Sequence, residues 1–262
     1  MSCSKRYAVC AALLLSLPAA QASELPAYQA FGDLLFNFSP PDRLSPNNFG
    51  SFTLADPRFG VVSVTAAGTP APALTADASI GPNLSPGIFG RGDMSLIYSL
   101  EILGPAGVVP VLIGAAGAAQ GFAASGASFA VESFWQLRDA GTVLIGDDIR
   151  SGQIDGGSFS QSFGHTVGIS LATNHVYAIA MLADAAAAAT LEGSRASAHA
   201  FVDPFFSFAL GVDPALFSFH LSDGIGNAAA AAVPEPSTLL LLTPALLLLG
   251  LLRAASGAPR VR

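Results

Sequence analysis

Basic residues are scarce in this sequence of 262 residues, and lysine occurs only at Lys5. Lysine and arginine together number 11 against 18 aspartates and glutamates, which gives a formal net charge of -7 and a pI near 4.8. Nucleic-acid binding needs clustered basic side chains, whereas the arginines between the two ends of this chain are scattered. The composition therefore argues against a nucleic-acid partner.

Charge of either sign is also low, at 11% of residues, while 52% are hydrophobic, so the chain is too apolar to be intrinsically disordered. The 27 glycines and 18 prolines interrupt the sequence too often for long helices. This composition favours many short strands joined by turns.

The N-terminal segment has the three parts of a secretory signal. Lys5 and Arg6 precede an apolar run at 8–17, and the small residues Ala20 and Ala22 follow at the two positions that a signal peptidase inspects. We therefore predict that a signal peptidase cleaves the chain after Ala22.

Cysteine is limited to Cys3 and Cys10, and both lie in the segment that this cleavage would remove. The mature chain would then contain no cysteine. That excludes disulfides, thiol catalysis and cysteine metal ligands from its chemistry.

A leucine-rich run at 239–252 lies near the C-terminus. As a helix it would be about 21 Å long, which is shorter than the roughly 30 Å hydrocarbon core of a membrane. A helix over 237–255 would reach about 28 Å, with Arg253 extending toward the interface, so a thin membrane span is feasible. An alanine linker at 228–232 precedes it, and the basic tail that ends at Arg262 is expected to stay cytoplasmic.

A short proline motif separates the linker from the apolar run. Its prolines lack backbone donors and hold Glu235 in an extended segment just outside the membrane, where a protease could bind it as a strand. A rigid spacer next to the membrane is the alternative. The motif consists of Val233, Pro234, Glu235, Pro236, Ser237 and Thr238.

Motif, span and basic tail, in this order over 233–262, resemble the PEP-CTERM sorting signal of Gram-negative bacteria. The resemblance implies an exosortase, a membrane protease that removes the anchor near the Pro-Glu-Pro motif. It also implies passage through the inner membrane, followed by release to the cell surface or extracellular matrix. One departure is that the arginines are spread along 253–262, which leaves the end of the helix open. A plain C-terminal membrane anchor is the alternative.

The body, 23–227, is long enough for one all-β domain with a substantial core. In one segment Phe129, Val131, Trp135 and Leu137 share a parity while polar residues occupy the other, as in a half-buried strand. We predict an all-β fold, a jelly-roll-like β-sandwich of about ten short strands. The other expected strands are 51–54, 61–65, 94–102, 108–113, 142–145, 167–171, 176–182, 194–202 and 216–221.

Several expected turns separate these strands, and two segments are ambiguous. Ala185 to Ala189, within 181–191, forms a short helix on propensity alone, with a loop as the alternative. The N-terminal part, 23–48, is expected to hold one edge strand and then an irregular loop. Gly226-Asn227, shortly before the tail, resembles the end of other PEP-CTERM bodies. The remaining expected turns are Gly146-Asp147-Asp148, Asp155-Gly156-Gly157, Thr173-Asn174-His175, Asp203-Pro204 and Asp213-Pro214.

Candidate ligands and catalytic groups are few. Asp147, Asp148 and Asp155 flank a glycine-rich turn and are weak calcium candidates, although their spacing does not match an EF-hand and a solvated acidic loop is the simpler interpretation. The four histidines have no metal-ligand spacing. Gly164 to Gly168 continues as a strand, which argues against a nucleophile elbow there. Trp135 has the parity of the core. No cofactor, metal or catalytic residue is predicted.

The leading hypothesis is an exported, non-catalytic surface or matrix protein associated with exopolysaccharide, as the resemblance implies. The alternative is a carbohydrate-binding module, which exposed aromatic residues on one sheet face would favour. A secreted hydrolase on a sandwich scaffold would require an Asp/Glu pair on one concave face.

Overall fold

The computed structural model describes residues 24–36, 42–44, 49–58, 60–82 and 87–227. The expected signal segment, the alanine linker and the sorting tail lie outside these residues. The described part of the chain is all-β, as predicted, and contains no helix. Its strands are β1 (Gln29–Phe36), β2 (Asp42–Leu44), β3 (Gly50–Asp56), β4 (Gly60–Ala67), β5 (Ala73–Ile80), β6 (Ile88–Leu103), β7 (Val108–Asp139), β8 (Thr142–Arg150), β9 (Ile154–Ala172), β10 (Val176–Ala189), β11 (Ala196–Phe208) and β12 (Ser218–Leu221).

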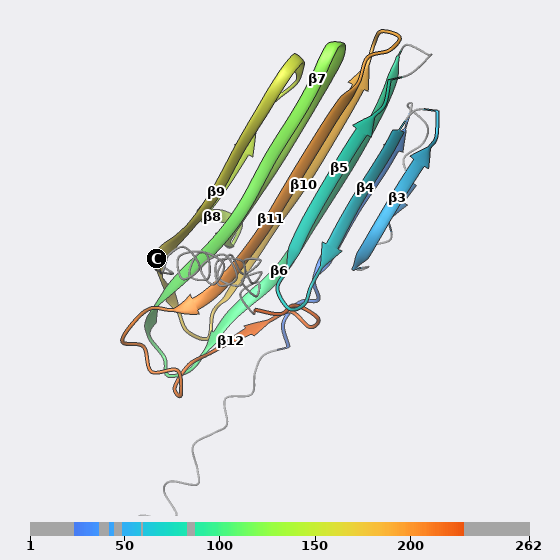
Figure 1. The fold of residues 1–262 in the computed structure, drawn as a ribbon. Coiled ribbons are helices and arrows are strands. Elements are labelled where there is room, and N and C mark those ends of the chain that lie inside the picture. The colour runs from blue at the N-terminus through green and yellow to red at the C-terminus, as the bar shows by residue number, and fades with distance from the viewer. Residues whose placement is uncertain (1–23, 37–41, 45–48, 59, 83–86, 228–262) are drawn as a thin grey trace, which may run out of the picture.

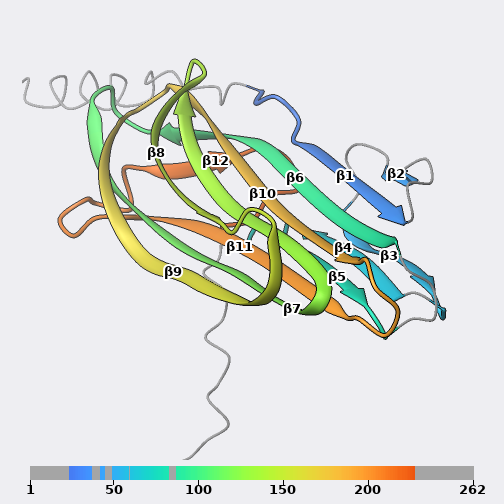
Figure 2. The same cartoon turned by 90° about the horizontal axis from the view of Figure 1, so that it is seen from above.

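The strands form a nearly closed antiparallel sheet that folds back on itself into two layers. Layer A contains β2, β1, β6, β10, the second half of β7 and β8, with β12 beside the end of β6. Layer B contains β3, β4, β5, β11, the first half of β7 and β9. In Figure 1 layer B forms a row, with β9, β7, β11, β5, β4 and β3 from left to right. Figure 2 shows the same strands from above.

Long strands join the two layers. β7 pairs with β8 along its second half and with β9 along its first half, so that the three form one long hairpin bent in its middle. On the other side of β7, β10 and β11 occupy the corresponding places in layers A and B. Gly126 lies at the bend of β7 with a φ of 76°, and a Cβ there would stand 2.5 Å from Leu191 Cδ1. A glycine is therefore required at this corner.

The core lies between the layers and follows the alternation of the strands along most of their length. Tyr98 to Ile102 of β6 are an exception, because all five are buried beside β12 and β10. Away from the bend the core contains large side chains, including the fully buried Trp135 and Tyr98, whereas the equally buried Phe129 lies near the bend, opposite Ala187. Toward the bend the core is filled mainly by alanines. In the middle of the strands the two layers are close enough for the Ser133 hydroxyl of layer A to donate a 2.6 Å hydrogen bond to the Phe201 carbonyl of layer B. The buried alanines include Ala76, Ala78, Ala119, Ala183, Ala185, Ala187, Ala189, Ala198 and Ala200.

The alanine run was wrongly expected to be a helix or a loop. Ala185 to Ala189 belong to β10, paired with β6 on one side and β7 on the other. Alternate alanines of this run are buried in the core. The backbone hydrogen bonds to strands on both sides outweigh the intrinsic helix propensity of alanine.

Two of the expected turns also lie inside strands. Gly146-Asp147-Asp148 is part of β8, and Asp155-Gly156-Gly157 is part of β9. The chain instead breaks between them, at 151–153, where β8 gives way to β9 at the corner of the sandwich. Thr173-Asn174-His175 is a turn as predicted, with Asn174 at a φ of 54°.

Asp203-Pro204 was expected to turn and lies within β11. β5 ends its pairing opposite Val202, so β11 beyond that point has β7 as its only strand partner among the described residues. Pro204 therefore lies where one side of the strand needs no ladder bond. The Asn227 side chain takes the place of the missing strand, donating to the Phe206 carbonyl and accepting from its amide.

At the N-terminus, β1 is not the edge strand that the sequence predicted. The three-residue β2 pairs with its outer side, and β6 pairs with its inner side.

Candidate binding face

The outer face of layer B is lined with hydroxyl groups. It results from the alternation that buries the apolar side chains of the same strands. One row of directly opposed residues crosses all six strands and is polar throughout. The row consists of Thr53, Ser63, Asp77, His199, Gln120 and Ser160.

The centre of this row is an ion pair. Asp77 Oδ1 lies 2.7 Å from His199 Nδ1. This hydrogen bond raises the pKa of His199 above its ordinary value of 6.5, against the opposing effect of burial. The pair is half-exposed, so the carboxylate and the imidazole can both bond to a ligand as well as to each other.

A double hollow lies along this row. One part, of about 440 Å³, is lined by the Asp77–His199 pair, Gln120 and Phe122. The adjoining part, of about 460 Å³, shares Phe122 and ends at Arg195. The Phe122 side chain is 42% exposed, and the Arg195 guanidinium carbon lies 5.6 Å from its ring centroid. We name this region the Phe122 hollow.

The Phe122 hollow combines an aromatic face with convergent polar groups. Hydroxyl, amide, imidazole and carboxylate groups stand on its floor and rim, which suits a ligand with many hydroxyls and a flat apolar face. Arg195 supplies the hollow with a cationic group.

The outer face of layer A has the opposite character. Four carboxylates on adjacent strands stand directly opposite one another: Asp33, Asp93, Asp184 and Glu132. Arg91 binds Asp184 through two hydrogen bonds of 3.0 and 2.8 Å. Burial raises the pKa of Asp93 to about 6, with further upward contributions from Asp184 and Asp33 and a downward one from Arg91. Arg150 also forms a 3.4 Å ion pair with Glu132, so two of the four carboxylates have a basic partner and the row keeps an excess of negative charge.

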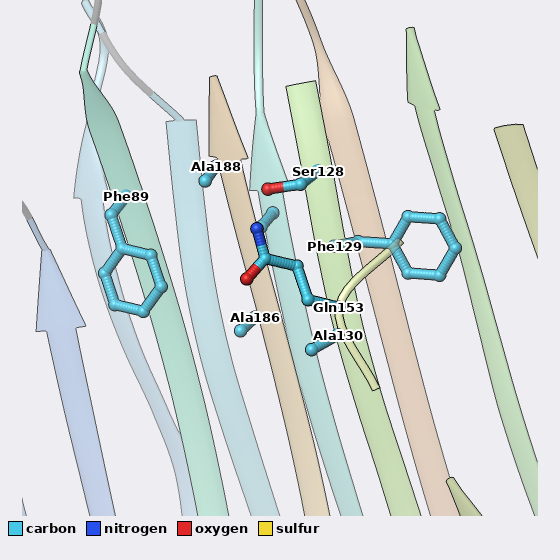
Figure 3. Close-up of a pocket in the computed structure, with 8 residues that line it drawn as sticks. Phe89, Ser128, Phe129, Ala130, Gln153, Ala186 and Ala188 are labelled. Carbon is cyan, nitrogen blue, oxygen red and sulfur yellow. The ribbon is translucent and has the colours of Figure 1, made fainter. Parts of the chain in front are cut away.

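Layer A also has a smaller hollow next to its acidic row, of about 140 Å³. Ala186, Ala188 and Ala130 lie between Phe89 and Phe129, with Gln153 in front of them (Figure 3). Its walls are largely apolar, and it lacks the convergent polar groups of the Phe122 hollow.

The calcium candidates are not brought together. Asp147 and Asp148 are consecutive in β8, so their side chains lie on opposite faces of the strand. Asp147 accepts a hydrogen bond from Trp135, whereas Asp155 accepts one from Gln153. Among the residues that the structure describes, no group of three or more histidine, aspartate or glutamate side chains is placed to hold a metal ion.

Each of the four histidines stands beside a different carboxylate. The distances are 3.4 Å for His165 and Asp147, 2.9 Å for His175 and Asp139, 2.7 Å for His199 and Asp77, and 3.5 Å for His220 and Glu101. Gly164 to Gly168 continue β9 without a turn, which excludes a nucleophile elbow at this position.

Sequence reasoning missed the Phe122 hollow. Gln120 and Phe122 lie in a stretch of β7 dominated by glycine and alanine, which has no alternation of large apolar residues. A weaker signal was available. Gln120 and Phe122 are two residues apart and therefore lie on the same face of β7, and Ser158 and Ser160 likewise share one face of β9.

The sorting motif at 233–238 and the cleavage residues Ala20 and Ala22 lie outside the described residues. Within the described part, no helix is long and apolar enough to cross a membrane.

Comparison with known proteins assigns no family. No family model matches the chain, and no curated protein matches it. Among solved structures, the chain is similar to one from "Structure of infectious bursal disease virus Gt strain", with 10% sequence identity over 87% of this chain and 75% of the other. The TM-score is 0.18, a value that carries no conclusion about fold or function.

Proposed function

We propose that this chain is an exported, non-catalytic protein that associates with extracellular polysaccharide. In this proposal a signal peptidase cleaves after Ala22, the helix at 237–255 holds the chain in the inner membrane, and an exosortase cleaves near the 233–238 motif. The jelly-roll-like sandwich then reaches the cell surface or extracellular matrix of a Gram-negative bacterium. The sorting part rests on the order of motif, apolar run and basic tail.

The Phe122 hollow is the observation that supports the polysaccharide part. Sugars present hydroxyls at their edges and C–H groups on their faces, and the hollow offers polar groups beside a half-exposed aromatic ring. Arg195 adds positive charge to this face of an acidic protein, and the His199 imidazole is paired with the Asp77 carboxylate. The acidic row on layer A would repel an anionic polymer, so we expect such a polymer to approach the outer face of layer B.

A carbohydrate-binding module is the second candidate, because Phe122 is an exposed aromatic residue beside a polar hollow. It differs from a general matrix component in having one defined ligand. Saturable binding of a short oligosaccharide would favour the module. Binding that is seen only with the long polymer would favour the matrix component.

Binding of the protein to polysaccharide tests the proposal. The probes are the extracellular polymer of the producing bacterium, alginate as a polyuronate, and dextran as a neutral polymer. Phe122→Ala should reduce the fraction that sediments with the bacterial polymer, and Phe31→Ala should not. Phe31 is the matched control, since it is 44% exposed and lies on β1 in layer A. Equal binding by wild type and Phe122→Ala would contradict a role for this face.

A further inference from the structure

Within the part of the chain that the structure describes, β9 is an edge strand of the sheet. It pairs with β7 along one side, and among the described residues no strand pairs with its other side. Figure 1 shows it at the margin of layer B. Natural proteins protect long edge strands with charges, prolines or bulges, because free N–H and C=O groups bind other strands. From Gly157 to Ala172 β9 contains no proline and no acidic or basic residue except His165.

The core is also incomplete along β9. Its inward-facing side chains Phe159 and Phe163 pack against the core but remain partly exposed, as does Ile169. The inward-facing Ile113 and Ala119 of the neighbouring β7 are fully buried. A further strand beside β9 would cover the exposed parts of these side chains and satisfy its free backbone groups.

The sequence of β9 indicates which strand fits. Its central segment reads the same in both directions: Phe159-Ser160-Gln161-Ser162-Phe163. The small residues Ser158 and Gly164 lie on either side of it. When two copies of such a segment pair antiparallel around a two-fold axis at Gln161, identical residue types stand opposite one another. Phe159 faces Phe163 of the second copy, Ser160 faces Ser162, and Gln161 faces Gln161.

We propose that β9 pairs with β9 of a second copy of this chain, in an antiparallel register centred on Gln161. Each Phe pair then adds an aromatic contact across the strands, and the paired glutamines can hydrogen-bond through their amides. In this register His165 faces Gly157, so no two like charges are opposed. Layers B of the two copies form one continuous sheet. The outer faces stay on the same side, which places two Phe122 hollows on one surface.

Disulfide trapping tests the register. The full chain with Cys3→Ser and Cys10→Ser is purified in detergent and oxidised after a single cysteine is introduced. Gln161→Cys would face its own symmetry mate at about 4.5 to 5.5 Å between Cα atoms, within the range that a disulfide spans. Ser170→Cys is the control, because in this register the two copies of residue 170 are roughly 60 Å apart.

The expected result is a disulfide-linked dimer of Gln161→Cys, roughly tenfold or more above that of Ser170→Cys, because only the first pair has disulfide geometry. A mixture of Ser160→Cys and Ser162→Cys chains should form the mixed dimer in preference to either homodimer. Equal trapping at 161 and 170, or trapping at neither, would overturn the proposal.

A charge variant provides the second measurement. Gln161→Lys places two ammonium groups opposite each other and should shift the chain from dimer to monomer in analytical ultracentrifugation, while Ser170→Lys should not. Circular dichroism verifies that each variant remains folded. A wild-type chain that is monomeric at every concentration tested would also reject the proposal.

Discussion

The indole nitrogen of Trp135 donates a 2.9 Å hydrogen bond to Asp147 Oδ2. Trp135 is fully buried in β7, and Asp147 stands directly opposite it in β8. The same carboxylate lies 3.4 Å from His165 Nε2 on β9, across the open margin of the sandwich. One aspartate thus satisfies a buried donor in layer A and contacts layer B. Its role is structural.

Asp147→Ala should lower the free energy of unfolding by about 1 to 3 kcal/mol, because the buried indole N–H would lose its acceptor. Asp148→Ala is the matched control, since its side chain lies on the opposite face of β8, and it should change stability by about 0.5 kcal/mol or less. Urea unfolding followed by tryptophan fluorescence measures both. If a chelator lowered the melting temperature of the wild type by as much as Asp147→Ala does, the calcium hypothesis for Asp147 would replace this account.

The acidic row of layer A should make stability fall as the pH rises. The pKa of Asp93 is raised from 3.8 to about 6, so between these values the folded state holds a proton that the unfolded state gives up. The contribution is complete below pH 4 and is lost as the pH rises through 6. Asp93→Asn should therefore stabilise the chain at pH 8, by on the order of 1 kcal/mol once solvent screening is discounted, and have little effect at pH 4.

Unfolding curves from pH 4 to pH 8 measure this effect. Asp223→Asn, at an exposed position after β12, is the control and should leave the curve unchanged. Burial also raises the pKa of Asp203 to about 6, so part of the slope should remain in Asp93→Asn. A variant that parallels the wild type at all pH values would contradict the assignment to Asp93.

The alanine run should tolerate larger residues on one face only. Ala185→Leu would overfill the alanine-lined part of the core, where Ala185 is fully buried, and should cost roughly 1 to 3 kcal/mol. Ala186→Leu points outward and should change stability by about 0.5 kcal/mol or less. Thermal unfolding of the two variants distinguishes them. Similar losses at both positions would argue against the alternation of a strand.

The sequence predicted those strands in which large apolar residues alternate with polar ones, as in β6 and around Trp135. It failed where small residues form strands, because Ala185 to Ala189 and the glycine-alanine stretch of β7 have no alternation to detect. Their strand structure depends on pairing with distant neighbours. For the same reason it divided β7 into two strands, since the bend at Gly126 is a feature of the packed layers.

The candidate site was harder to predict than the fold. Phe122, Arg195 and the Asp77–His199 pair come from separate strands, and only the register of the sheet brings them together. By contrast, the 233–238 motif is contiguous in sequence, and its interpretation as a sorting signal remains a prediction from the sequence alone.

The exported protein should begin at Ser23 and contain no cysteine. Mass spectrometry of the protein recovered from outside the cell measures the N-terminus. A reducing agent should leave its melting temperature unchanged, because Cys3 and Cys10 have been removed. An intact Met1, or a clear drop in melting temperature on reduction, would contradict the signal-peptide interpretation.

Insertion of the apolar run into the membrane can be tested separately from recognition of the 233–238 motif by a protease. Leu247→Arg adds roughly 3 kcal/mol to the insertion of a marginal span and should prevent orderly sorting. The variant should be found free in the periplasm instead of in the inner membrane. Leu247→Ile, which keeps the span apolar, is the control and should fractionate as the wild type does.

Fractionation of Glu235→Ala in the producing bacterium tests the central claim, that the tail is a sorting signal read by a protease. The charge lies outside the hydrocarbon, so its loss should leave insertion intact. We predict that uncleaved Glu235→Ala accumulates in the inner membrane while the wild type is cleaved near 233–238 and released. Cleavage and release of Glu235→Ala at the wild-type level would show instead that Glu235 is not recognised and that the tail is a plain membrane anchor.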